Sequence, residues 1–107
     1  GANGIVHGGA IAAVLDEAMG VAAYEAGQPG YTVNMTYNYR SHILIGEKII
    51  ITAQVDKIEG RKVFASCKAA LLDGTIAVDG IGLFIFSDVL KAELDAHPYV
   101  PDSTKNE

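Results

Sequence analysis

The stretch GGAIAAVLDEAMGVAAYEA, residues 8–26, decides the fold because it is the one long run of helix-forming residues in the chain. Alanine, leucine and methionine favour a helix, and Gly27 followed by Pro29 supplies the signal that ends it. Apolar residues lie nearly all round this predicted helix, a pattern typical of a helix that protein surrounds on several sides. We therefore expect a central helix over residues 8–26.

After Pro29 the hydrophobic period changes to two, which indicates β-strands. Turn signals at Glu59-Gly60 and Asp73-Gly74 separate the later strands. The predicted elements are strands over residues 31–40, 48–58, 61–72 and 76–86 and a short helix over residues 89–96. We expect the strands to form an antiparallel meander. Because the sheet must bury one face, the sequence predicts an α+β fold in which a curved sheet wraps one long helix.

The length and charge of the chain limit its organisation and partners. With 107 residues we expect one domain over residues 1–90 and a tail over residues 91–107. The formal net charge of -5 repels phosphate backbones, so nucleic acid is not an expected partner. The longest stretch without charge, residues 1–15, is shorter than the roughly 20 residues of a membrane span.

Hydropathy and cysteine content point to an assembly in a reducing compartment. Half of the residues are hydrophobic and the mean hydropathy is +0.23, which favours an oligomer that covers apolar surface. Cys67 is the single cysteine, so no intrachain disulfide can form, and we expect this side chain to be buried. His42 and His97 have no partner spacing suited to zinc, so no metal is expected.

The candidate site begins at the loop His7-Gly8-Gly9. The first N–H groups of a helix lack partners within it, so Gly8 and Gly9 can offer donors to an anion or a developing oxyanion. The same glycines could instead serve only to make a tight turn, which a ring nitrogen of His7 could hold.

Asp16 interrupts the apolar helix, where a carboxylate is costly unless something outside the helix pairs with it. Gly20 lies one turn further along the same face and leaves space for a substrate or a partner helix. A partly exposed aspartate on a polar edge shared with Glu17 is the plainer alternative. Gly8 and Asp16 are eight residues apart, about 12 Å along a helix, so one subunit cannot present both to one carbonyl. We predict that two helices pack antiparallel in a dimer and form two composite sites.

Further polar residues lie on the strands. Thr32 opens the first strand, on its polar face with Asn34, and its hydroxyl could orient a water toward Asp16. An ordinary surface threonine is the alternative. Three cations at strand ends could contact phosphate groups or simply be solvated: Arg40, Arg61 and Lys62.

The run GIVHGGAIA, residues 4–12, with Asp16 nine residues after the histidine and Gly20 four later, resembles the acyl-CoA thioesterases of the hotdog fold. Further matches are Asn38-Tyr39-Arg40, residues 56–62 (DKIEGRK) and Ser66-Cys67. Through them the chain is most similar to thioesterase superfamily members four and five, over residues 4–86.

This resemblance implies hydrolysis of a fatty acyl-CoA thioester, with Asp16 as general base or nucleophile and the Gly8 N–H as oxyanion donor across a dimer interface. It makes His7 the motif histidine and Thr32 the hydroxyl that places substrate or water. The substrate-binding residues that we predict are Gly9, Gly20, Asn34, Arg40, Arg61 and Lys62, the three cations contacting the phosphates of CoA. The acyl chain is expected along the helix near Val14, Ala18 and Met19.

The resemblance also implies a homodimer with a continuous sheet, in some cases a dimer of dimers, and an intracellular location, cytoplasmic or mitochondrial. No cofactor is expected, because CoA is part of the substrate. The chain departs from the family in two ways. A strand normally precedes the His-Gly-Gly loop and is expected here to be missing, truncated or supplied differently. The asparagine that many relatives place six residues before the histidine would fall at Gly1, not at Asn3.

Two alternatives to hydrolysis are considered. A catalytically weak hotdog module for binding or regulation would keep the dimer with little turnover. A hotdog dehydratase relies on a histidine with a differently placed carboxylate, so the position of Asp16 favours hydrolysis.

Overall fold

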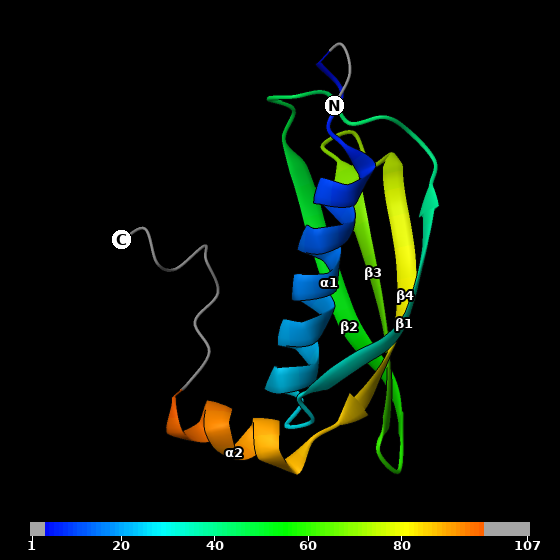
Figure 1. Cartoon of the computed structure of the whole chain (residues 1–107). Helices are drawn as coiled ribbons and strands as arrows, with labels where there is room; N and C mark the ends of the chain where they lie inside the picture. The colour runs from blue at the N-terminus through cyan, green and yellow to red at the C-terminus, as the bar shows by residue number, and fades with distance from the viewer. Residues whose placement is uncertain (1–3, 98–107) are drawn as a thin grey trace.

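The computed structural model describes residues 4–97, which form a helix, four strands and a second helix (Figure 1). The elements are α1 (Gly8–Glu25), β1 (Gly30–Tyr39), β2 (Ile49–Glu59), β3 (Lys62–Leu71), β4 (Ile76–Phe86) and α2 (Asp88–Ala96). Each lies within one residue of the predicted bounds. The predicted boundary at residue 90 falls inside α2, and the predictions that concern Gly1, Asn3 and the tail beyond residue 97 lie outside the described residues.

The sheet is antiparallel with the strand order β1-β4-β3-β2, so the predicted four-stranded meander is wrong for β1. Only β2, β3 and β4 are consecutive neighbours, because tight turns join them, whereas β1 pairs with β4. No tight turn joins β1 to β2. The connection, residues 40–48, instead passes over one end of the sheet, where Leu44 forms an isolated bridge with Ile5 (Figure 1).

The helix α1 lies against one face of the sheet and buries one stripe of its surface. The buried residues, each four apart in sequence and therefore on one face, are Ile11, Leu15, Met19 and Ala23. Val14 is 44% exposed, so the described chain covers α1 on one side only. The expectation of protein on several sides of this helix is therefore not met within a single chain.

Two glycines of β4 allow side chains of β1 to lie between the sheet and α1. A Cβ atom at Gly80 would lie 2.6 Å from Cδ1 of Tyr37, and one at Gly82 would lie 2.7 Å from Sδ of Met35. Both distances are shorter than real carbon contacts, so these positions need glycine for the β1 side chains to cross β4.

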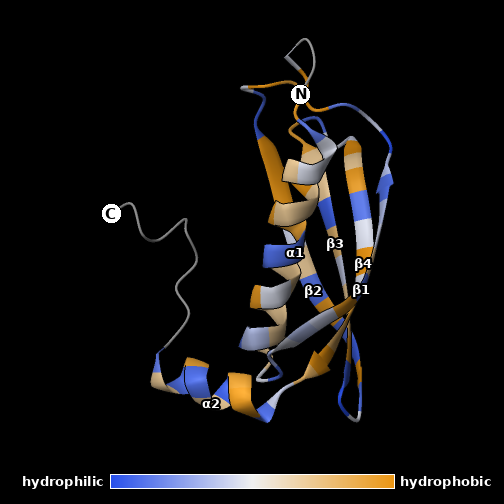
Figure 2. Cartoon of the chain, in the orientation of Figure 1, coloured by the Kyte–Doolittle hydropathy of each residue, from blue (hydrophilic) through white to orange (hydrophobic). Residues whose placement is uncertain are grey.

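The second helix, α2, lies across the C-terminal end of α1 (Figure 1). Its N-cap is Ser87, whose hydroxyl accepts a hydrogen bond from the Leu90 N–H at 3.0 Å. The helix α2 carries both hydrophilic and hydrophobic residues (Figure 2), and it is amphipathic because the half-buried Leu90 and Leu94 are four apart and share one face. Neither helix within residues 4–97 has the length and apolar character that crossing a membrane requires.

Candidate active site

The start of α1 is capped by His7. Its ring Nδ1 accepts a hydrogen bond from the Gly9 N–H at 2.9 Å. The expected turn-holding role of His7 is therefore confirmed, and the Gly9 N–H is occupied rather than open to a ligand. The Gly8 N–H has no acceptor among residues 4–97. Of the two glycine amides, only that of Gly8 is left for an oxyanion.

Two tyrosines of β1 fix the first turns of α1 on the sheet. The Tyr39 hydroxyl donates to the Gly8 carbonyl at 3.0 Å, and the Tyr37 hydroxyl donates to the Ala12 carbonyl at 3.2 Å. Burial, together with the nearby Asp16 charge, raises the pKa of Tyr37 to about 12, so this phenol stays protonated and donates. The sequence predicted no role for either tyrosine, although Tyr39 belongs to a matching motif and the spacing of two placed both on one strand face.

Thr32 contacts Asp16 directly, whereas the sequence analysis expected its hydroxyl to orient a water toward Asp16. The Thr32 hydroxyl donates to Oδ1 of Asp16 at 3.2 Å, and Asp16 is half-buried in the single chain. One chain therefore leaves this carboxylate partly exposed, with a hydroxyl beside it.

A β-bulge decides the direction of Thr32. In the pairing of β1 with β4, Thr32 lies opposite Phe84 and Asn34 opposite Leu83, so Val33 is an extra residue. Phe84 is buried under α1, and paired residues share a face of the sheet, so Thr32 faces the helix and Asn34 faces away. The prediction that Thr32 shares the polar face of Asn34 is wrong, because strict alternation does not continue through a bulge.

The predicted site residues of α1 occupy separate places within one chain. Gly8 lines a pocket of about 330 Å³ at the N-terminal end of α1, together with Tyr39 and His42. Asp16 lies two turns further on and does not line this pocket. Gly20 follows Asp16 by one turn, and a Cβ atom built there meets nothing within 4 Å.

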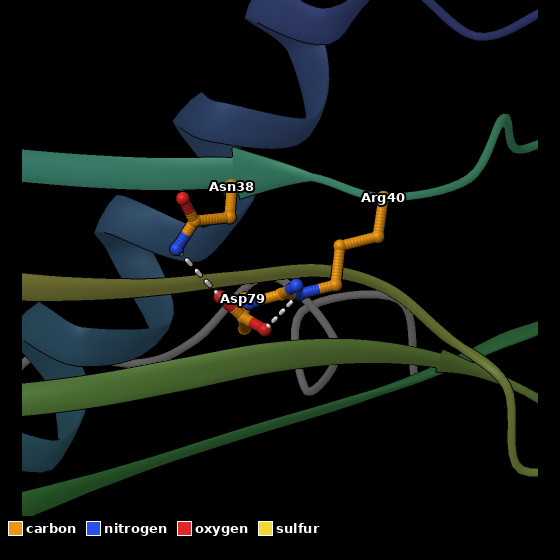
Figure 3. A network of polar contacts seen from close by, with 3 residues as sticks. All are labelled: Asn38, Arg40 and Asp79. Carbon is orange, nitrogen blue, oxygen red and sulfur yellow. Dashed lines mark hydrogen bonds and ion pairs between the residues drawn. The ribbon is translucent and has the colours of Figure 1, made fainter.

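Of the three predicted phosphate-binding cations, Arg40 lies apart from the adjacent pair Arg61-Lys62. Arg40 forms an ion pair and hydrogen bonds with Asp79, which also accepts a bond from the Asn38 amide at 3.0 Å (Figure 3). The hydrogen bond from Arg40 holds the pKa of Asp79 below its usual range. Arg61 pairs with Asp88 at 2.7 Å, near the start of α2.

Arg40 and Lys62 lie toward opposite ends of the sheet. Tyr39, next to Arg40, pairs with Val78 of β4, whereas Lys62 is opposite Ile85. These two β4 positions are seven residues apart, about 24 Å along a strand. One phosphate group therefore cannot contact both cations within one chain.

Cys67 is buried, as predicted, and is a free thiol. Burial is the main cause that raises the pKa of the Cys67 thiol to about 11, so the group is a poor nucleophile at neutral pH. Within residues 4–97, no group of three or more His, Cys, Asp and Glu side chains is arranged to hold a metal ion.

Comparisons with known proteins agree with this architecture. The family model described as "Thioesterase superfamily" matches residues 3–77. Acyl-coenzyme A thioesterase THEM4 of Bos taurus is 36% identical over 93 residues, which cover 86% of this chain and 38% of that protein. Acyl-coenzyme A thioesterase THEM5 of Mus musculus is 35% identical over 86 residues, or 79% of this chain and 35% of that protein.

The crystal structure of zebra fish thioesterase superfamily member 2 aligns with a TM-score of 0.73 at 31% identity, covering 81% of this chain and 65% of that one. The four-stranded antiparallel sheet with its helix is thus the α+β hotdog fold of these structures. The chain belongs to the thioesterase superfamily, as the sequence resemblance indicated. It spans less than two fifths of the length of the two curated relatives.

Proposed function

We propose that this chain is an acyl-CoA thioesterase that hydrolyses a fatty acyl-CoA thioester to the free acid and CoA. Relatives that match most of the chain are named acyl-coenzyme A thioesterases, which supports this substrate class. The observation that carries the proposal is the contact between the Asp16 carboxylate of α1 and the Thr32 hydroxyl of β1. The N-terminus of the same helix α1 has the open Gly8 N–H. Together they supply a base or nucleophile, a polar group that positions it, and an oxyanion donor.

In the proposed reaction the thioester carbonyl oxygen accepts a hydrogen bond from the Gly8 N–H, and Asp16 promotes attack on the carbonyl carbon. Asp16 either takes a proton from a water that attacks this carbon or attacks it directly to form an anhydride, which water then hydrolyses. In both routes the C–S bond breaks, the CoA thiolate leaves with the electron pair and takes up a proton, and the acid is released. Thr32 holds the carboxylate in position through its hydroxyl.

The proposed site is shared by two subunits. Gly8 and Asp16 lie about 12 Å apart along α1, too far for one carbonyl to reach both in one chain. Exposed apolar residues of the edge strand β1, such as Tyr31 at 59% and Val33 at 58%, support a second copy at this edge of the sheet. In a homodimer with antiparallel helices, Gly8 of one subunit approaches Asp16 of the other, and a dimer of dimers can follow.

The first test is release of free thiol from acyl-CoAs of several chain lengths. We expect turnover that falls at least about a hundredfold in Asp16→Asn, the usual range for losing a general base. Absence of release with every acyl-CoA, from a folded dimeric protein, would favour the alternative of a binding or regulatory module.

The oxyanion role of Gly8 has a matched pair of variants. Proline is tolerated at the first position of a helix, and the preceding His7 has φ -65° and ψ 133°, which suits a residue before proline. Gly8→Pro therefore removes the N–H, whereas Gly8→Ala adds a Cβ near Tyr39 and keeps the N–H. We expect kcat to fall about a hundredfold or more for Gly8→Pro relative to Gly8→Ala.

Sharing of the site is tested by mixing subunits. Asp16→Asn and Gly8→Pro homodimers are each expected to be inactive, whereas a mixed dimer retains one intact composite site. Unfolding and refolding the two variants together should restore activity toward a quarter of the wild-type level. If no mixing ratio restores activity although mixed dimers form, the shared site is wrong. The proposal keeps the intracellular location, cytoplasmic or mitochondrial, that the resemblance implies.

A further inference from the structure

A groove of about 260 Å³ lies between the C-terminal half of α1, the start of β1 and the helix α2. Its lining residues are Glu17, Gly20, Val21, Tyr24, Pro29, Gly30, Leu90 and Leu94. The two leucines come from one face of the amphipathic α2 and are half-buried, whereas their neighbour Val89 is 73% exposed. Leu90 and Leu94 of α2 therefore form an apolar wall of the groove opposite Gly20, which has no side chain.

This groove continues from the Asp16–Thr32 pair. Gly20 follows Asp16 by four residues, about 40° round the helix and about 6 Å along it, and Gly30 precedes Thr32 by two residues on the same strand face. Any chain attached to a carbonyl at Asp16 and directed toward the C-terminal end of α1 passes over Gly20.

A second groove lies on the neighbouring face of α1, between Val14, Ala18 and strand β2, and it shares Glu17 and Val21 with the first groove. Val14 and Ala18 are each about 160° round the helix from Asp16. An acyl group held at Asp16 meets the groove at Gly20 first and reaches the second groove only past Glu17 and Val21. The groove at Gly20 is therefore the nearer path from Asp16, and we prefer it to the path along Val14 and Ala18 that the resemblance implied.

We propose that the groove between α1 and α2 is the acyl-chain subsite of the thioesterase, with Gly20 as its floor and Leu90 and Leu94 as its wall. This inference rests on the proposed function. An apolar cavity of about 150 Å³ accommodates a ligand of six carbons, benzene, so 260 Å³ corresponds to about ten carbons. The occupant is thus the hydrocarbon tail of a medium-chain acyl thioester, and α2 limits the chain length.

The test uses Leu94→Trp to fill the groove and Val89→Trp as a matched control on the exposed side of α2. Because the chain contains no tryptophan, the emission of the introduced indole shows its surroundings directly. We expect emission at shorter wavelength for Leu94→Trp than for Val89→Trp, which verifies that the folded protein holds the ring in the groove. Gly20→Val is a second filling variant that acts from the floor, in case one replacement disturbs α2.

The readout is the ratio of kcat/KM for decanoyl-CoA to that for butyryl-CoA. We expect this ratio to fall about tenfold or more in Leu94→Trp and Gly20→Val, because excluding a few methylenes from an apolar site has at least that effect. Val89→Trp should keep the ratio within about twofold. An active wild type whose ratio is unchanged in both filling variants overturns the subsite but leaves the proposed function intact. A wild type that hydrolyses neither thioester overturns both.

Discussion

Replacing Thr32 by valine tests the geometry that the bulge at Val33 creates. Valine has nearly the same shape but cannot donate a hydrogen bond, so the change removes the contact of 3.2 Å to Asp16 and little else. A hydrogen bond to a charged acceptor contributes about 1.5–3 kcal/mol, and this pair is exposed, so we take the lower end. A loss of about 1.4 kcal/mol in the transition state lowers kcat about tenfold.

Thr36→Val is the matched control. Thr36 lies on the same strand, and its hydroxyl also contacts a neighbour, Asn34, at 3.5 Å, but on the face turned away from α1. Because valine keeps the β-branched shape that strands favour, both variants should unfold within about 0.5 kcal/mol of each other. Steady-state kinetics on an acyl-CoA and urea unfolding measure both effects. Equal losses of kcat in the two variants, or less than a twofold loss for Thr32→Val, would refute the reasoning.

Two further predictions concern stability and can be measured by urea unfolding. Gly80→Ala should destabilise the fold by about 1–3 kcal/mol, because its Cβ would lie 2.6 Å from the Tyr37 ring. Gly20→Ala has open space around its Cβ and should stabilise the fold by up to about 1 kcal/mol. Equal effects of the two variants would contradict the requirement for glycine in β4. The hydrogen bond from Arg40 lowers the pKa of Asp79, so this pair stabilises the folded state above about pH 4 and its contribution is lost as the pH falls below that value. The difference in urea midpoint between wild type and Asp79→Asn should therefore shrink from pH 6 to pH 3, and a difference that does not change with pH would rule the pair out.

The elements of the fold and the centre of the site could be predicted from local sequence. The helix over residues 8–25 and all four strands follow from hydrophobic period, helix formers and turn residues, which act within a few positions of one another. His7, Gly8 and Asp16 were recognisable because a glycine pair before a helix and a carboxylate within one are unusual locally. The cap formed by His7 needs only residues two positions apart.

The position of β1 and the direction of Thr32 were decided by tertiary structure. The sequence contains signals for tight turns between β2, β3 and β4 but no local signal that pairs β1 with another strand. Only packing against α1 and pairing with β4 place β1 at the edge of the sheet opposite β2. The bulge at Val33 reverses the alternation that the sequence suggests, because pairing with β4 determines where a strand gains a residue. Tyr37, Tyr39 and the groove under α2 likewise depend on contacts between residues far apart in the chain. Local propensities therefore determined which elements form, and long-range pairing determined which side chains meet at Asp16.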